Sequence, residues 1–358
     1  MKDEKVISFP HLGEYHYVFK YLFSHLTKAK VISAPPISKK TIELGSKYAP
    51  EFVCVPFKYN LGNYIEALDR GANILIQAGG GCRYGYYAEV QEQILKDLGY
   101  HFSFYNLTLK NGSIKRIYKV FKNINPKLSF FKFVHFFLMS FFMIILLDKT
   151  DHFIRENIAF EVKTNSFIDL KEEMTKSFVK CNNLITLFFY YFKYKNKFNK
   201  IPIKKDRDCL KIGIIGELFT AMEPFSSYNL EKILAKNHIQ IKRFTNVSYL
   251  LFFKRFKIKK MLRSVRDYCK YKIGADGLDN IYRVKWLYEN NYDGIIHTKP
   301  FGCTPEIGAI PIIQRMCLDL NMPITYFSFD NQTETEGVYT RLEAFIDMLK
   351  MRKEKEND

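Results

Sequence analysis

Short apolar runs alternate with segments of helical periodicity over the first third of the chain. The apolar runs lie at 6–9, 31–34, 72–77 and 101–105, and the periodic segments at 14–26, 40–48, 61–70 and 84–98. Runs of this length bounded by Gly, Pro or charged residues are typical of buried strands, and the longer segments are typical of amphipathic helices. The alternation predicts a mostly parallel sheet with helices on both faces.

The same alternation resumes near residue 210. Strands are predicted at 212–215, 239–244, 294–297 and 324–329, and helices at 228–236, 305–320 and 338–352. The sequence therefore predicts an α/β fold with two doubly wound, mostly parallel-sheet domains.

The middle of the chain has a different pattern, with long aromatic and charged stretches and almost no turn residues. This pattern predicts a helical insertion. We expect an N-terminal α/β domain over residues 1–120, a helical aromatic and basic insertion over 121–205, and a C-terminal α/β domain over 206–358.

One run in the insertion, residues 133–147, is nearly all apolar and is bounded by Lys132 and Asp148. It is shorter than the roughly 20 residues that a membrane span needs. We interpret it as a buried or partner-facing helix; the alternative is a membrane contact, in a membrane-associated protein. The shorter run 184–192 has the same interpretation.

Charge raises the question of nucleic acid. The 358 residues include 55 Lys and Arg against 37 Asp and Glu, a net charge of +18. Much of the lysine accompanies Ile, Asn, Phe and Tyr, whose codons are A/T-rich, so genome bias explains part of the excess. We predict no nucleic-acid partner; the remaining charge favours an anionic ligand or an acidic partner.

Seven cysteines form no closely spaced pairs, and the charged N-terminus has no secretory signal. We therefore expect a cytoplasmic protein with thiols rather than disulfides. For Cys181, Cys209, Cys269 and Cys317 we expect core positions.

Two cysteines share a topological position. Cys82 and Cys303 each follow a predicted strand and precede a predicted helix, where helix N-termini lower the pKa of thiols and stabilise anions. Gly79, Gly80, Gly81 and Gly85 allow backbone near Cys82 to approach a bulky cofactor and to adopt positive φ. No G-x-G-x-x-G spacing fits there and no phosphate loop is present, so these residues favour a metal site over a nucleotide site. Zinc is one candidate metal for such a site.

Several motifs together resemble the 2-hydroxyacyl-CoA dehydratase family, in particular its activase-related branch of double-cubane cluster proteins and benzoyl-CoA reductase subunits. The motifs are CVPFKYNLG (54–62), GGCRYGYY (80–87), HTKPFGCTPE (297–306), FDNQTETEG (329–337) and TRLEAF (340–345). They occupy both outer thirds of the chain in the family's order, and the middle third matches little.

The resemblance implies a [4Fe-4S] cluster on Cys54, Cys82 and Cys303; Cys54 is assigned by the resemblance alone. A double-cubane cluster needs more cysteine ligands than three, and no second motif supplies them, so we expect a single cubane. The family's partner is a separate ATP-hydrolysing iron-sulfur activase, and the family suggests a homo- or heterodimer in an anaerobic host.

The resemblance also implies an open iron position where an acyl-CoA thioester is reduced and its hydroxyl expelled. Arg83, Glu217 and Glu306 are the candidate catalytic residues; their structural alternatives are a carboxylate pair, a helix cap and a helix-dipole contact. We expect a dehydratase-like lyase or an ATP-dependent reductase component. The alternative is a non-catalytic subunit that relays electrons.

Overall fold

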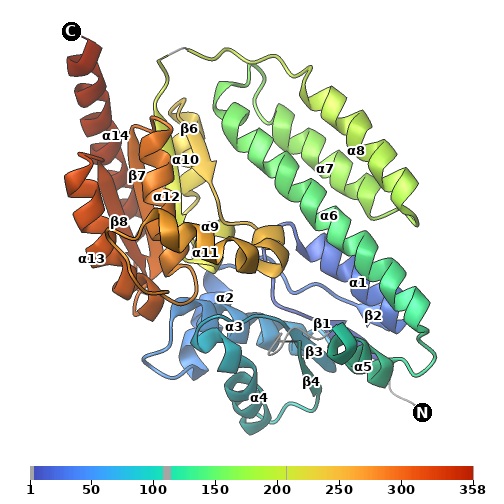
Figure 1. Ribbon diagram of the computed structural model, residues 1–358. Coiled ribbons are helices and arrows are strands. Elements are labelled where there is room, and N and C mark those ends of the chain that lie inside the picture. Colours follow the sequence, from blue (N-terminus) through green and yellow to red (C-terminus); the bar gives the residue numbers. More distant parts are fainter. Residues whose placement is uncertain (1–3, 108–113, 207, 358) are drawn as a thin grey trace. The chain divides into compact units, whose positions relative to one another are not determined.

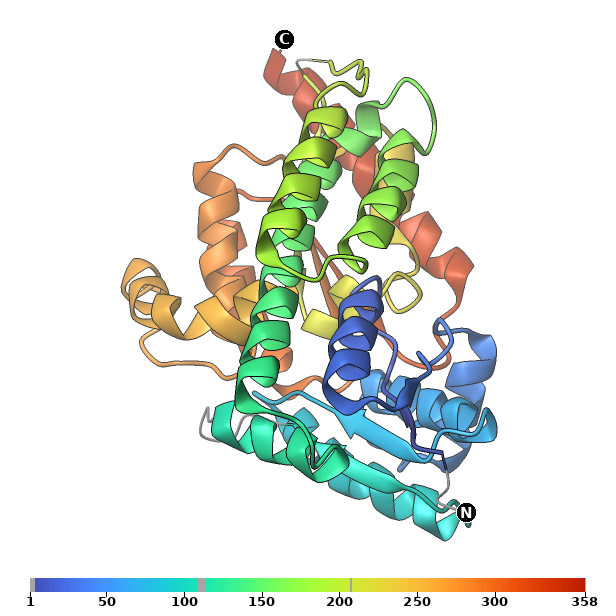
Figure 2. The same cartoon turned by 90° about the vertical axis from the view of Figure 1, so that its right-hand side faces the viewer.

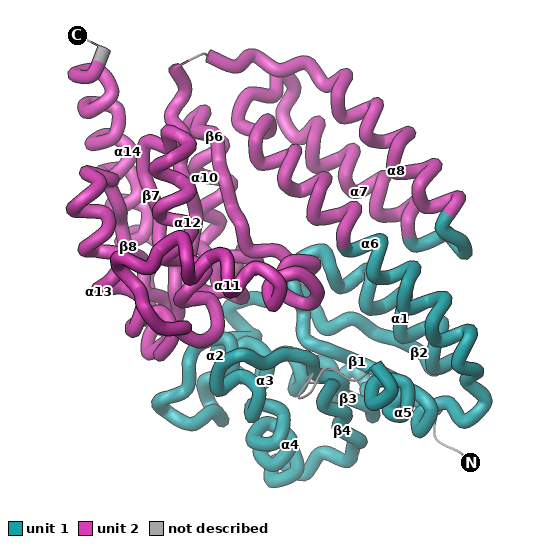
Figure 3. The backbone as a smooth tube through the Cα atoms, in the orientation of Figure 1, with its two compact units in different colours: residues 1–144, 179–184 teal, residues 145–178, 185–358 magenta. Residues whose placement is uncertain are grey.

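The computed structural model describes residues 4–107, 114–206 and 208–357, and the chain folds into two compact units. Unit 1 comprises residues 1–144 and 179–184, and unit 2 comprises residues 145–178 and 185–358 (Figure 3). Each unit contains a four-stranded, all-parallel sheet. This confirms the predicted α/β class.

The sheet of unit 1 has the strand order β2-β1-β3-β4, and parallel neighbours pair throughout (Figure 1). Its strands are β1 (Val6–Ser8), β2 (Lys30–Val31), β3 (Ile74–Gln77) and β4 (Ser103–Asn106). Its helices include α1 (His16–Thr27), α2 (Lys39–Tyr48), α3 (Val55–Asp69), the 3₁₀ turn η1 (Arg83–Tyr86), α4 (Tyr87–Asp97) and α5 (Ile114–Ile124).

Apolar side chains alternate between the two faces of β3 and so create two cores in unit 1. Ile74 and Ile76 pack with α1 and α5, while Leu75 packs with α3 and α4. The period of two residues along a strand is the reason that consecutive isoleucine and leucine residues serve opposite faces. Helices therefore cover both faces, as the sequence predicted.

The sheet of unit 2 repeats this topology with the strand order β6-β5-β7-β8. Its strands are β5 (Lys211–Gly216), β6 (Gln240–Arg243), β7 (Gly294–Pro300) and β8 (Ile324–Phe329). Its helices include α7 (Ser166–Phe178), α8 (Leu184–Phe198), α9 (Leu218–Met222), α10 (Leu230–Lys236), the π-helical turn η3 (Tyr249–Phe253), α11 (Lys254–Ser264), α12 (Gly277–Glu289), α13 (Thr304–Asp319) and α14 (Thr335–Asn357).

Unit 2 also has one core on each face of its sheet. Ile212 and Ile214 pack with α10 and α14, and Ile215 and Ile295 pack with α11, α12 and α13. In each sheet the strand that comes second in sequence pairs on one side of the first strand, and the strand that comes third pairs on its other side. The resulting switch point lies between β1 and β3 in unit 1 and between β5 and β7 in unit 2, and ligands of open α/β sheets bind at the carboxyl ends of such strands.

The middle of the chain is helical, and α7 and α8 lie beside the long helix α6 (Phe130–Asn157) in both views (Figures 1 and 2). Helix α6 is shared between the two units, so the middle is not a unit of its own, and the predicted boundaries at residues 120 and 205 stay a prediction.

The helix that contains the apolar run 133–147 is longer than the run itself. Helix α6 continues beyond Lys132 and Asp148 to 28 residues, because these two charges lie within a continuous helix rather than at its ends. With the turn that follows, the segment Phe130–Phe160 is long and apolar enough to cross a membrane, judged by length and composition alone. Core helices pass the same test, and Phe133, Met139 and Met143 of α6 are fully buried.

Candidate functional site

Cys54 lies at the N-terminus of helix α3. It is the residue directly before the helix, with extended backbone angles, and Pro56 occupies the first turn. The helix was predicted to start only at residue 61; it starts at Val55 because proline is favoured in a first turn, where its missing N–H costs nothing. The Cys54 Sγ lies 2.6 Å from the hydroxyl oxygen of Tyr87.

Cys82 lies at the start of η1, directly after the glycines that follow β3, and its side chain is exposed. Its Sγ accepts a hydrogen bond from the backbone N–H of Tyr84 at 3.4 Å. Gly81 has a φ of +93°, a backbone conformation that a side chain would strain. The predicted position of Cys82 between a strand and a helix is confirmed.

The glycine prediction was only partly right about backbone conformation. Gly79 and Gly81 have positive φ, whereas Gly80 and Gly85 do not. In the turn that leads into η1, the residues with positive φ therefore alternate with a residue that has ordinary φ. Gly85 is buried and a Cβ there would lie 3.8 Å from the Gly80 Cα, so its small size permits close backbone packing. Contact of Gly80, Gly81 and Gly85 with a cofactor stays a prediction.

Arg83 connects the two cysteine segments of unit 1. Its exposed guanidinium donates from Nη1 to the backbone carbonyl of Phe52 at 3.4 Å, two residues before Cys54. Burial, and then the charge of the Cys54 thiolate, raise the pKa of Tyr87 well above its ordinary value, while the Arg83 charge opposes this shift. Cys54, Cys82, Arg83 and Tyr87 therefore interact electrostatically within unit 1.

Cys303 occupies the equivalent position in unit 2. It follows β7 across Phe301 and Gly302 and is the residue directly before helix α13, with Pro305 in the first turn. Its side chain is buried, at 9% exposed. The predicted strand–cysteine–helix arrangement is confirmed, and both Cys54 and Cys303 are followed by proline at the second position.

The three cysteines are divided between the units: Cys54 and Cys82 belong to unit 1, and Cys303 belongs to unit 2. Within the parts of the chain that the structure describes, no group of three or more His, Cys, Asp or Glu side chains is arranged to hold a metal ion. A common site for the three thiolates stays a prediction. The other four cysteines are buried as expected, with Cys181, Cys209, Cys269 and Cys317 between 3% and 9% exposed.

Glu217 follows β5 at the switch point of unit 2 and caps helix α9. Its carboxylate accepts hydrogen bonds from the backbone N–H groups of Phe219 and Thr220 at 3.0 and 2.9 Å. Burial raises the pKa of Glu217 to about 7; the capping bonds oppose this rise and the charge of Asp276 adds to it. Glu217 therefore caps a helix, which was the structural alternative to a catalytic role. The raised pKa also places the proton exchange of its carboxyl group near neutral pH.

Glu306 lies in the first turn of α13 and is fully buried. The His297 ring donates from Nε2 to Glu306 Oε2 at 2.7 Å, and the Asn280 amide donates to both carboxylate oxygens at 2.9 and 3.0 Å. The Asn280 carbonyl in turn accepts from the backbone N–H of Gly216 at 3.1 Å. Glu306 thus joins β7, α12 and the end of β5.

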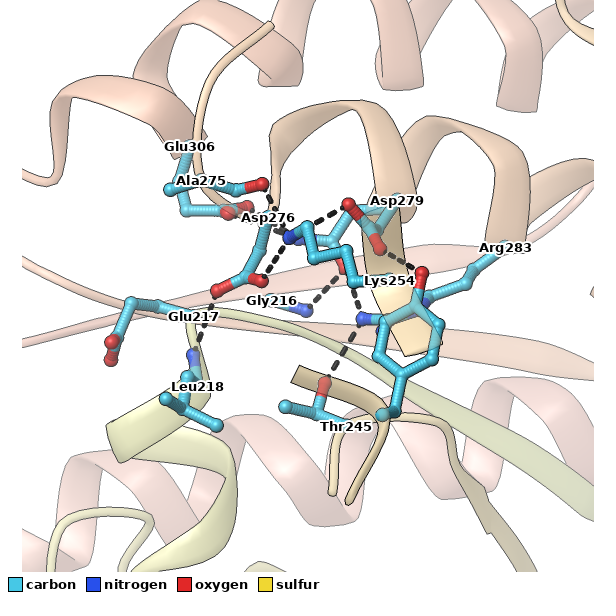
Figure 4. Close-up of polar contacts among 12 residues, drawn as sticks. Gly216, Glu217, Leu218, Thr245, Lys254, Ala275, Asp276, Asp279, Arg283 and Glu306 are labelled. Carbon is cyan, nitrogen blue, oxygen red and sulfur yellow. Dashed lines mark hydrogen bonds and ion pairs between the residues drawn. The ribbon is translucent and has the colours of Figure 1, made fainter. Parts of the chain in front are cut away.

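A second set of buried charges lies beside this network (Figure 4). The Lys254 Nζ lies 2.9 Å from carboxylate oxygens of both Asp276 and Asp279. Burial alone would lower the pKa of Lys254, but the two carboxylates outweigh it and raise that pKa. Tyr249 of η3 donates to Asp279, and Arg283 donates to Thr245 Oγ1 at 2.9 Å.

Sequence reasoning missed these buried polar residues. Asp276 and Asp279 lie around the start of α12, where acidic residues alone indicate a helix N-terminus, and the sequence gives no sign that Lys254 reaches them. Asp276 also accepts from the backbone N–H of Leu218 at 3.3 Å, so it contacts the residue next to Glu217. The carboxyl edge of the sheet in unit 2 is therefore lined by a connected polar network.

Comparison with known families gives a match within unit 2. Residues 259–349 match the family model of the 2-hydroxyglutaryl-CoA dehydratase D-component. This part of the chain is similar to that component of the 2-hydroxyacyl-CoA dehydratase family. The match confirms the resemblance drawn from the motifs.

The dehydratase match lies wholly within unit 2 and contains Cys303, Glu306, Lys254's partners Asp276 and Asp279, and the strands β7 and β8. It does not include Cys54, Cys82 or Glu217. A comparison with curated proteins gives no match to this chain. The family match supports a dehydratase-type component.

Proposed function

We propose that this dehydratase-family component holds one [4Fe-4S] cluster on Cys54, Cys82 and Cys303. It receives low-potential electrons from an ATP-hydrolysing iron-sulfur activase and reduces or dehydrates an acyl-CoA or another small substrate. The observation that carries the proposal is that each of these three cysteines immediately precedes a helix or helical turn.

Helix starts suit the donor set that the cluster requires. Backbone N–H groups and the positive end of the helix dipole favour the thiolate over the thiol, and they also favour an anionic group bound to it. Of the four remaining cysteines, Cys317 lies within helix α13 rather than before its start, and burial raises the pKa of its thiol to about 12. Position at a helix start therefore separates the proposed ligands from this core cysteine.

When bound, the cluster supplies one-electron chemistry and a Lewis-acidic iron. Glu217 would provide the proton transfer, because a carboxyl group with a pKa of about 7 is both a competent donor and a competent acceptor near neutral pH. Arg83 would bind a phosphate or carboxylate of an anionic substrate, because its guanidinium is exposed beside Cys82. Glu306 would position β7 and α13, and with them Cys303.

The electron-relay alternative is favoured by one observation. Both acidic candidates already have structural partners: Glu217 caps α9, and Glu306 is fully buried against His297 and Asn280. A subunit that only relays electrons needs no proton-transfer group. The two functions differ in whether a substrate changes the properties of the cluster.

The decisive experiment is anaerobic purification of the full chain, followed by iron and sulfide determination and EPR spectroscopy of the reduced protein. The proposal expects about four iron and four sulfide per chain and a signal typical of a reduced cubane. Cys54→Ala, Cys82→Ala and Cys303→Ala should each lower iron content by more than half, whereas Cys269→Ala, in the core, should retain it. Wild-type protein without iron would refute the cluster, and full iron in the Cys82→Ala and Cys303→Ala double variant would refute the ligand assignment.

A second measurement separates enzyme from relay. Acyl-CoA compounds with a 2-hydroxyl group are added to the reduced protein, and the EPR signal is compared with and without Glu217→Gln. A substrate-dependent change in the signal supports the enzyme, and an unchanged signal together with electron transfer to a second protein supports the relay.

A further inference from the structure

Helix α8 carries an exposed apolar stripe. Ile185, Phe189 and Phe192 are 83%, 63% and 56% exposed. Their spacing of four and three residues places them on one face of the helix. Three large apolar side chains that share an exposed face form a patch, whereas single exposed apolar residues need no explanation.

The opposite face of α8 is firmly packed, so the stripe does not result from a loose helix. Leu187 and Phe198 are buried, and the Phe198 ring stacks on Phe167 of α7 at a centroid distance of 6.2 Å. The Tyr194 and Ser177 hydroxyls lie 2.9 Å apart and also join α8 to α7. Figure 1 shows α8 running beside α7 along its length.

Lysines flank the stripe. At about 100° per residue, Lys193 projects on one side of the stripe and Lys195 on the other. Both are exposed, as is Lys200, which follows the end of the helix at Phe198. Residues 184–205 contain six lysines and no Asp or Glu, within a chain of net charge +18.

We propose that α8 is an interfacial helix, which docks unit 2 onto the surface of a membrane rich in anionic phospholipids. Phenylalanine and isoleucine on one face, bordered by lysines, are the pattern of helices that lie in the plane of the headgroups. Its 15 residues are too few to span a bilayer. For residues 184–192 this proposal takes up the membrane contact that was the alternative to a buried or partner-facing run.

An anionic lipid surface fits the observations better than a protein partner does. The stripe lies on the convex surface of a single helix, so a partner would have to supply the groove. Lysines on both flanks suit a surface of uniform negative charge, which attracts each one without a specific geometry. The proposal concerns α8 alone and not a span by α6, in which Phe133 and Met143 are fully buried and 39% of the most apolar window of Phe130–Phe160 is buried.

The test is co-sedimentation of the full anaerobic protein with vesicles of phosphatidylcholine alone or with 30% phosphatidylserine. Wild-type protein should bind the anionic vesicles, and binding should fall as salt rises from 50 to 500 mM. The triple variant Ile185→Ser, Phe189→Ser and Phe192→Ser should bind at least tenfold more weakly. Lys193→Gln with Lys195→Gln should weaken binding about twenty-fivefold, because each lysine near such a surface contributes about fivefold.

A matched control is the variant Leu318→Ser with Met351→Ser, whose side chains are 78% and 57% exposed on α13 and α14. This control should bind as the wild type does, and circular dichroism should show all variants folded. Absence of wild-type binding, or equal binding by the stripe variant, would overturn the proposal. The proposal would also be overturned if, without lipid, the wild type sedimented as a dimer and the stripe variant as a monomer. In that case the stripe would contact a second copy of the chain.

Discussion

The His297 ring donates a hydrogen bond to the Glu306 carboxylate at 2.7 Å, and both side chains are fully excluded from solvent. Eight residues, 298–305, separate His297 from Glu306; they include the end of β7, Cys303 and the start of α13, and this bond closes that segment. Asn280 holds the same carboxylate from α12. The pair therefore fixes the connection that carries the proposed cluster ligand.

Glu306→Gln should destabilise the protein while preserving its fold. An amide offers one acceptor oxygen in place of two, so either His297 or Asn280 loses its acceptor in a buried site. We expect the free energy of unfolding to fall by about 1–3 kcal/mol, measured by urea denaturation. If Glu306 acts only by position, iron content and any substrate effect on the EPR signal should persist in the folded variant; selective loss of the substrate effect would instead indicate a catalytic role.

Lys254→Met should lower the free energy of unfolding by more than Glu306→Gln does. The substitution leaves Asp276 and Asp279 buried without their cation, and the expected loss is about 3–5 kcal/mol at pH 7. Adding Asp276→Asn to Lys254→Met should recover part of that loss, because it removes one uncompensated charge. The control Lys232→Met, on the exposed side of α10, should change the free energy of unfolding by less than about 0.5 kcal/mol. Equal effects of the two lysine substitutions would contradict the pairing.

Glu217 should make stability depend on pH between about 4.5 and 7. Its folded pKa is raised from 4.5 to about 7, so over this range the folded state binds a proton that the unfolded state has released. Stability contributed by this group is therefore highest at low pH and falls as pH rises, by on the order of 2 kcal/mol after allowance for partial exposure. The free energy of unfolding of Glu217→Gln, measured from pH 5 to 8, should fall less steeply than that of the wild type; parallel curves would contradict the shifted pKa.

Gly216→Ala tests the end of β5 beside Glu217. Gly216 has a φ of +129°, and a Cβ would lie 1.9 Å from the backbone oxygen of Thr298 on β7. Neither strand can move away without breaking the sheet, so the expected loss is about 3 kcal/mol or more. Gly308→Ala is the matched control: it lies within α13 with nothing near its Cβ position, and it should stabilise the protein by up to about 1 kcal/mol in thermal unfolding.

The alternation of apolar runs and helical segments was sufficient to predict both sheets, because strand and helix periodicities are local properties of the chain. It also placed Cys82 and Cys303 between a strand and a helix. It failed at the start of α3, where Pro56 marked a first helical turn that the apolar pattern did not. The family was recognisable from motifs because their residues are close in sequence.

Tertiary structure alone decided the rest. The sequence could not show that Lys254 reaches Asp276 and Asp279, or that Asn280 joins Glu306 to Gly216, because these contacts join residues 22 or more positions apart. Exposure likewise depends on what packs against a helix: the apolar residues of α6 and α8 look alike in sequence, yet Phe133 is buried and Phe189 is exposed. Local pattern fixes which element forms, and only packing determines which of its faces meets solvent.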